Sequence, residues 1–162
     1  MRSFRKSSLT AVMVVLSALL LLPVLCLGAG TVTYTIQDAL DGKARFITFS
    51  ATADASAHTY PDTSTTIGET AGYWLCSMET DPGSTAPTDD YDITVKSALG
   101  TDLLGGAGAN RDETNTEIAY PTIDSTSGQK GCVPINSALT LGISGNSVDS
   151  ATTTIKLDLR RQ

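Results

Sequence analysis

The sequence contains few of the residues from which most metal and redox sites are built. Its 162 residues include three cysteines, one histidine and one tryptophan, and aromatic side chains make up 6% of the chain. One cysteine lies in the N-terminal apolar segment. The other two are isolated from each other and from the histidine, so they lack the spacing of metal ligands. We therefore expect no metal bound through cysteine and histidine.

Catalytic motifs are also missing. The one histidine, His58, lies in a polar segment, and no Gly-x-Ser-x-Gly nucleophile elbow is present. A pair of carboxylates suited to a glycosidase carries no information in a chain this rich in aspartate. Because the combination of nucleophile, base and orienting group is absent, we expect the protein not to be an enzyme.

The glycine-rich run 100–108 resembles a phosphate-binding loop only in composition. Neither Lys-Ser/Thr nor a helical pattern follows it, and Gly-x-Gly-x-x-Gly is absent from the chain. We instead expect these glycines to adopt positive φ angles and to allow close chain packing around a bulged turn. No cofactor is expected.

The first 28 residues have the parts of a secretory signal peptide. Arg2, Arg5 and Lys6 form a positive stretch without an acidic residue, and the apolar run 11–22 follows. Residues 26–28 then place small side chains where a signal peptidase cleaves. The sequence thus predicts a signal peptide at 1–28, a single domain at 29–162, and a periplasmic, cell-surface or extracellular location.

Two alternatives stay open for this segment. As a retained membrane anchor, residues 11–27 would be at the short end of what crosses a bilayer, and Pro23 interrupts them. Lipidation of Cys26 would require a small residue where bulky Leu25 stands. In either case the membrane would be contacted only through this uncleaved or lipidated segment.

Cleavage makes the chain strongly acidic. The sequence has 11 Lys and Arg against 17 Asp and Glu, and three of the basic residues precede the cleavage point, which leaves 8 against 17 and a net charge of −9. An acidic surface repels phosphate backbones and anionic lipid headgroups. We therefore exclude nucleic acids and anionic membrane surfaces and expect protein partners, including self-assembly.

Cys76 and Cys132 are the only cysteines of the mature chain. An even pair in an oxidising compartment is most simply one disulfide, and two buried free thiols are the alternative.

Threonine, serine, aspartate, alanine and glycine dominate the composition, which favours short strands joined by turns over helices. Eight segments show β-forming residues or period-two alternation: 31–36, 44–53, 72–78, 91–95, 116–120, 132–135, 139–143 and 152–159. Their regular spacing predicts an all-β fold, a single antiparallel β-sandwich or jelly-roll-like domain of about eight short strands.

Three local features of this domain follow from the same pattern. We expect 31–36 and 44–53 to pair, and 145–150 to form a hairpin-like turn between the last two strands. We expect the Trp74 indole to lie in the core, with a sugar-stacking surface position as the alternative.

Carboxylates gather at two places in the chain, Asp89, Asp90 and Asp92 and then Asp112, Glu113 and Glu117. Loops at one end of a sandwich bring such groups together when they bind calcium. No EF-hand or repeat-type calcium pattern is present, so we expect solvated turns, and Asp89, Asp90, Asp92, Asp112 and Glu117 are no more than weak metal candidates.

Residues 72–162 resemble a family of small phage virion structural proteins of heads or tails. The likeness is carried, in order, by 81–88 (DPGSTAPT), 91–94 (YDIT), 103–112 (LLGGAGANRD), 115–117 (NTE), 144–148 (SGNSV) and 150–152 (SAT). The resemblance implies a β-rich structural module that assembles with partners and catalyses nothing.

Two features depart from a virion role. Virion proteins assemble in the cytoplasm without a signal peptide, and the cysteine pair suits an oxidising space. A prophage-derived or parallel module exported by a bacterium reconciles both. We expect a non-catalytic structural or assembly module acting through its surface or strand edges. The alternative is a secreted or surface binding module, an adhesin for a glycan or a cell-surface protein.

Cleavage of the expected signal peptide can be tested. The mature N-terminus should lie between Ala29 and Thr31, because the cleavage signal ends at Gly28. Mass spectrometry of the exported protein measures this directly, and an intact Met1 on a membrane-bound species would contradict it.

Overall fold

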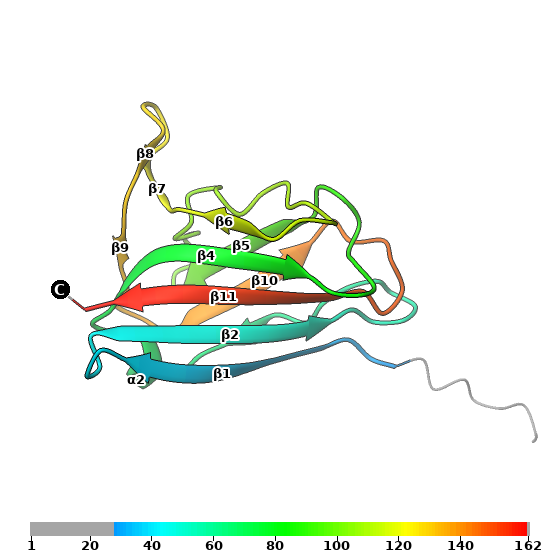
Figure 1. Cartoon of the computed structure of the whole chain (residues 1–162), viewed down its shortest axis with the longest axis horizontal. Helices are drawn as coiled ribbons and strands as arrows, with labels where there is room; N and C mark the ends of the chain where they lie inside the picture. Colours follow the sequence, from blue (N-terminus) through cyan, green and yellow to red (C-terminus); the bar gives the residue numbers. More distant parts are fainter. Residues whose placement is uncertain (1–27, 162) are drawn as a thin grey trace, which may run out of the picture.

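The structure is a computed structural model, and it describes residues 28–161 (Figure 1). The expected signal peptide therefore lies outside the described residues except for Gly28. The described residues form one short helix and eleven strands: β1 (Thr31–Ala39), β2 (Ala44–Thr52), β3 (Thr63–Ser64), α2 (Ile67–Thr70), β4 (Trp74–Pro82), β5 (Asp92–Ser97), β6 (Glu117–Ala119), β7 (Thr122–Asp124), β8 (Gln129–Lys130), β9 (Val133–Pro134), β10 (Leu139–Ser144) and β11 (Thr152–Arg160).

The larger sheet has the order β1-β2-β11-β4-β6, and β9 also pairs with β4 (Figure 1). Its four long strands, β1, β2, β11 and β4, have nine residues each. The expected pairing of the first two strands is confirmed, in a register that runs from Thr31 opposite Thr52 to Ala39 opposite Ala44. This sheet forms one layer of the domain.

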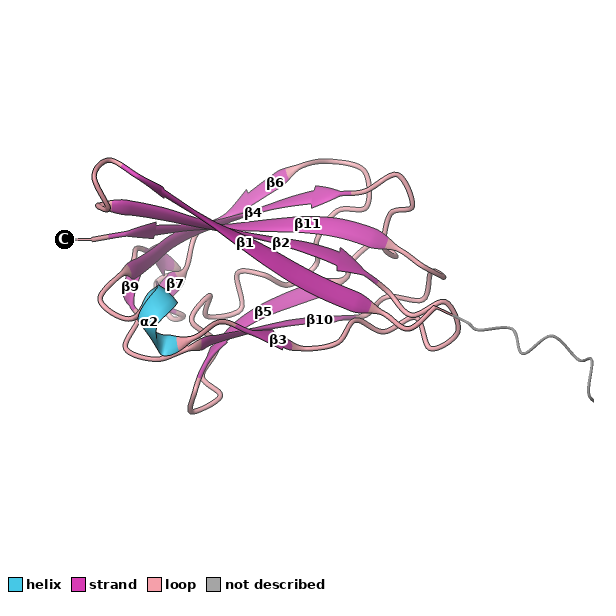
Figure 2. Ribbon diagram, turned by 90° about the horizontal axis from the view of Figure 1, so that it is seen from below, coloured by secondary structure: helices cyan, strands magenta, loops and turns pink. Residues whose placement is uncertain are grey.

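A three-stranded sheet of order β3-β10-β5 forms the second layer (Figure 2). All strand pairs are antiparallel. The core between the layers joins buried side chains of both sheets: Ile47, Phe49, Leu75, Met78, Ile155 and Leu157 from the larger, Ile93, Val95, Leu139 and Leu141 from the smaller. The predicted all-β antiparallel sandwich is thus confirmed.

The connection 145–150 differs from the expectation. It leads from β10 in the smaller sheet to β11 in the larger one, so it crosses between layers and is not a hairpin. The Asn146 side chain holds it in shape: its Nδ2 donates to the carbonyls of His58 (2.8 Å) and Val148 (2.9 Å). The sequence predicted both strands but did not reveal that they belong to different sheets.

Trp74 is not in the core. Its side chain is half-buried, whereas its neighbours Tyr73 and Leu75 are 3% and 0% exposed. The pairing of β4 with β11 is irregular at Cys76, because Ser77 opposes Asp158 and Leu75 opposes Leu159. Before this bulge, odd-numbered residues of β4 face the core, and after it even-numbered residues do. The run of β-forming residues in the sequence did not indicate this change of face.

Four short elements were missed. β3, β7, β8 and the four-residue α2 lie outside the eight segments expected to be strands, and β7 and β8 pair as a hairpin. The glycine-rich run behaves as expected: Gly100, Gly105 and Gly106 have φ angles of 84°, 58° and 80°. A Cβ at Gly108 would collide with the carbonyl oxygen of Ile93, so the close approach of this run to β5 requires glycine there.

Phe46 and Phe49 test which face of β2 stabilises the fold. Phe49 is 0% exposed, whereas Phe46 is half-buried on the outer face beneath Lys156, whose Nζ is 5.0 Å from the ring centroid. Phe49→Ala should lower the free energy of unfolding by about 3–5 kcal/mol. Phe46→Ala should lower it by about 1 kcal/mol. Urea denaturation measures both, and equal losses would contradict the assignment of faces.

Candidate functional site

Loops from both sheets meet at one end of the sandwich, on the right in Figure 1. They are joined by backbone hydrogen bonds, such as Ala53 N to Ala151 O (2.8 Å) and Asp90 N to Arg111 O (3.0 Å). Thr88 N also donates to the Asn146 side chain (3.1 Å). The loops therefore form one connected rim.

Three of the five carboxylates named as weak metal candidates hold turns of this rim. Asp92 Oδ1 accepts the Asn110 amide at 2.9 Å, and Asp112 Oδ1 accepts the Thr114 amide at 2.6 Å. Glu117 Oε2 accepts the Asp112 amide at 3.0 Å, while Asp89 and Asp90 are exposed. Within residues 28–161 no three His, Cys, Asp or Glu side chains are grouped to hold a metal ion.

The backbone amides also explain the acidity of two rim carboxyls. Amides of Ala57 and Ser56 donate to Asp54 and lower its pKa to about 2. The amides of Thr114 and Asn115 lower the pKa of Asp112 in the same way. Both groups stay ionised at neutral pH and stabilise their turns there.

Acidic residues far outnumber basic ones at the rim. It carries Asp54, Asp81, Asp89, Asp90, Asp92, Asp112, Glu113 and Asp149, against the single basic residue Arg111. At the opposite end, around the β1–β2 turn and the C-terminus, four basic residues, Lys43, Arg45, Arg160 and Arg161, lie among four acidic ones, Asp38, Asp41, Glu69 and Asp158. One end of the sandwich is therefore acidic, and the other has balanced charge.

His58 is part of the rim. Its Nε2 lies 2.6 Å from Asp149 Oδ1, and its carbonyl accepts the Asn146 amide group. Both contacts join the His58 loop to the 145–150 connection, so His58 helps to hold these two loops together.

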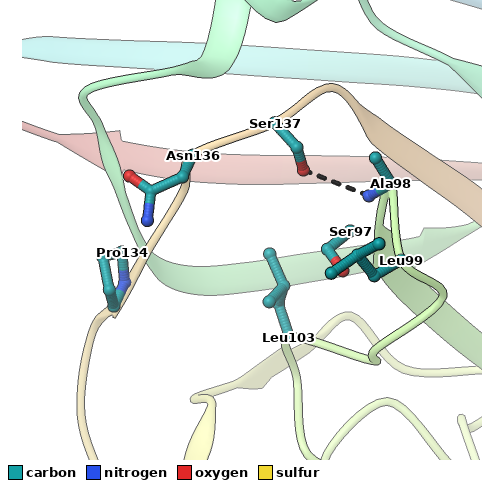
Figure 3. A pocket seen from close by; sticks show the side chains of 7 residues that line it. All are labelled: Ser97, Ala98, Leu99, Leu103, Pro134, Asn136 and Ser137. Atoms are coloured by element: carbon teal, nitrogen blue, oxygen red, sulfur yellow. Dashed lines mark hydrogen bonds between the residues drawn. The ribbon is translucent and has the colours of Figure 1, made fainter.

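Two adjoining hollows lie at the other end of the smaller sheet. The first, of about 330 Å³, is lined by Ser97, Ala98, Leu99, Leu103, Pro134, Asn136 and Ser137 (Figure 3). Leu99 is 96% exposed at the tip of its turn, and the Ala98 amide donates to Ser137 Oγ at 3.1 Å. The second, of about 300 Å³, shares Leu103 and Pro134 and extends to Ile123 and Cys132.

The disulfide lies beside these hollows. Cys76 and Cys132 are bonded, with Cα atoms 4.1 Å apart, which confirms the expected pair. The bond ties the bulge of β4 to the chain just before β9. Such a bond is consistent with an oxidising, exported environment.

The free edge of β1 is the one long open strand edge in the described part of the chain. β1 ends the larger sheet, and β6 and β3, at other edges, have only three and two residues. The edge of β5 is covered by the glycine-rich run. The Leu103 amide donates to the Val95 carbonyl, and the Gly108 carbonyl accepts the Ile93 amide, both at 2.8 Å.

Register identifies which backbone groups of β1 face outward. Ala53 N bonds to Ala151 O, and Arg161 N to Lys43 O, so odd residues of the β2 segment bond toward β11. Even residues of β2, such as Ser50, therefore bond toward odd residues of β1, such as its partner Thr33. The N–H and C=O groups of even β1 residues consequently face away from the sheet.

These outward groups belong to Val32, Tyr34, Ile36 and Asp38. Of them, the Val32 carbonyl accepts the Thr63 hydroxyl at 3.3 Å. The segment 31–37 has no charged residue and no proline, the devices that usually block an edge. The residue pattern predicted this strand, and strand edges were expected as contact sites, but no sequence signal indicated that this strand ends its sheet.

The side chains of β1 are held firmly on their inner face. The Tyr34 ring lies 5.4 Å from the Phe49 ring, and its hydroxyl donates to Glu69 at 3.0 Å. This hydrogen bond raises the pKa of Tyr34. The pKa of Glu69 is lowered, mainly by the Thr66 amide. These contacts fix the Tyr34 side chain on the inner face of β1.

Comparison with protein-family models, with curated proteins and with solved structures found no match for this chain. No helix among residues 28–161 is long and apolar enough to cross a membrane.

The disulfide yields a prediction for stability. Replacing both cysteines by alanine (Cys76→Ala with Cys132→Ala) should lower the free energy of unfolding by about 2–4 kcal/mol, because the bond closes a 56-residue segment. Ser77→Ala, next to it on β4, is the control and should change little. An unchanged denaturation midpoint in the double variant would contradict the prediction.

Proposed function

We propose that this protein is an exported, non-catalytic structural module that assembles with other protein chains through the open edge of β1. The single observation that carries the proposal is this edge: nine residues long, uncharged from Thr31 to Gln37, and paired on one side only.

Physical chemistry supports an added strand at this position. Unpaired N–H and C=O groups in a row are a template for another strand, and natural proteins usually protect them. Each hydrogen bond to an added strand contributes about 0.5–1.5 kcal/mol net. Half-buried side chains of Val32, Tyr34 and Ile36 supply apolar contact along the same edge.

The rest of the molecule suits a building block. The disulfide and the interlocked rim make the sandwich rigid, so little order is lost when a partner binds. The resemblance of 72–162 to virion structural proteins agrees with an assembly role, and the signal peptide and cysteine pair agree with assembly after export.

Site-specific photo-crosslinking in exporting cells tests this function. A benzoylphenylalanine placed at Thr35, an exposed residue of β1, should give protein adducts, because a partner strand would lie beside it. Thr154, on the same outer face but in the central strand β11, is the matched control and should give few.

Equal labelling at Thr35 and Thr154, or none at either, would contradict an edge-mediated assembly. So would a purified monomer that binds a glycan array through residues remote from β1, which would favour the adhesin alternative.

A further inference from the structure

We infer that the partner of the β1 edge is a second copy of this chain, whose own β1 pairs antiparallel with the first around a two-fold axis at Thr35. This inference rests on the proposed function and specifies its partner. The two larger sheets would then form one continuous sheet across the axis.

Backbone geometry permits this pairing. The outward N–H and C=O groups of β1 belong to even-numbered residues. In an antiparallel pair of two copies, each hydrogen-bonded pair must therefore join two even-numbered residues. A register centred on Thr35 satisfies this condition, because Tyr34 forms a hydrogen-bonded pair with Ile36 of the second copy, and Ile36 with its Tyr34. The Val32 carbonyl keeps its hydrogen bond from the Thr63 hydroxyl. Thr35 then faces Thr35 of the second copy as a non-hydrogen-bonded pair on the axis.

The side chains are self-complementary in this register. Tyr34 and Ile36 are half-buried on the inner face, so the axis places an aromatic next to a β-branched side chain twice. On the outer face, Thr33 and Thr35 are exposed, and paired threonines at the axis are favourable cross-strand neighbours. No pair of like charges meets along the edge.

Charge distribution selects an antiparallel second copy. β1 begins beside the acidic rim, where Gly30 lies against the backbone of Asp54, and it ends at the turn that holds Asp41 and Lys43. Antiparallel pairing keeps the two rims at opposite ends of the dimer. Each rim then lies toward the end of the second copy where basic and acidic residues balance. Parallel pairing would bring two acidic rims together.

A cysteine scan of the exported protein tests the two-fold axis. Thr35→Cys should form an intermolecular disulfide on mild oxidation, because Cα atoms of a non-hydrogen-bonded pair lie about 4.5 Å apart. Thr33→Cys faces Gln37 of the second copy and should cross-link far more slowly. Thr154→Cys also adds one cysteine to the native pair, but on the central strand β11. It controls for disulfide exchange with Cys76 and Cys132.

A charge variant tests the contact without cross-linking. Thr35→Lys places two ammonium groups at the axis and should weaken dimerisation at least about fivefold by sedimentation analysis. Ser50→Lys adds the same charge to the exposed outer face of β2 and should change nothing. An equimolar mixture of Thr35→Lys and Thr35→Glu should restore dimers as heterodimers.

Each contrary outcome has a separate meaning. A dimer that forms equally well in Thr35→Lys, or cross-links equally at Thr33 and Thr35, overturns the two-fold pairing. A monomer at high concentration, with photo-adducts at Thr35 only to a different protein, overturns the second copy as partner while the proposed function stands. A monomer with no adduct at Thr35 overturns both.

Discussion

The pairing of β11 with β2 on one side and β4 on the other is the interaction on which the rest of the structure depends. β11 is the last strand of the chain, yet it lies in the middle of the larger sheet and contributes Ile155, Leu157 and Leu159 to the core, each 0% exposed. It thereby joins the N-terminal hairpin β1–β2 to the disulfide-bonded strand β4. With β11 at the centre, β1 is left at the edge, and this position creates the open strand on which the proposed function rests.

β-forming residues, together with period-two alternation such as that of 31–36, predicted the long strands and the pairing of β1 with β2, because period two follows directly from one buried face. It did not reveal sheet membership, since 145–150 looks the same whether it turns back or crosses between layers. The outward position of Trp74 was missed because a bulge at Cys76 reverses the alternation. The open edge of β1 was also beyond the sequence, because strand order depends on long-range pairing. The disulfide could be predicted from the number of cysteines in the mature chain and the expected oxidising compartment.

Charge and hydrogen bonding divide the molecule into regions with different roles. At the rim, carboxylates such as Asp54 and Asp112 are used to hold turns, and their negative charge keeps this end apart from other acidic surfaces. The β1 edge, in contrast, combines uncharged side chains with unpaired backbone groups. An otherwise acidic protein therefore offers one long neutral surface where another chain can approach, and an antiparallel approach leaves the acidic ends apart.

Amide hydrogen exchange at β1, resolved by NMR at each residue, tests the central claim most directly. The amides of Thr33 and Thr35 bond to β2 and should be protected at every protein concentration. The amides of Val32, Tyr34 and Ile36 face outward, so the account predicts protection in concentrated protein that is lost on dilution. Fast exchange of these three amides at all concentrations, with and without partner proteins from the exporting cell, would contradict the account.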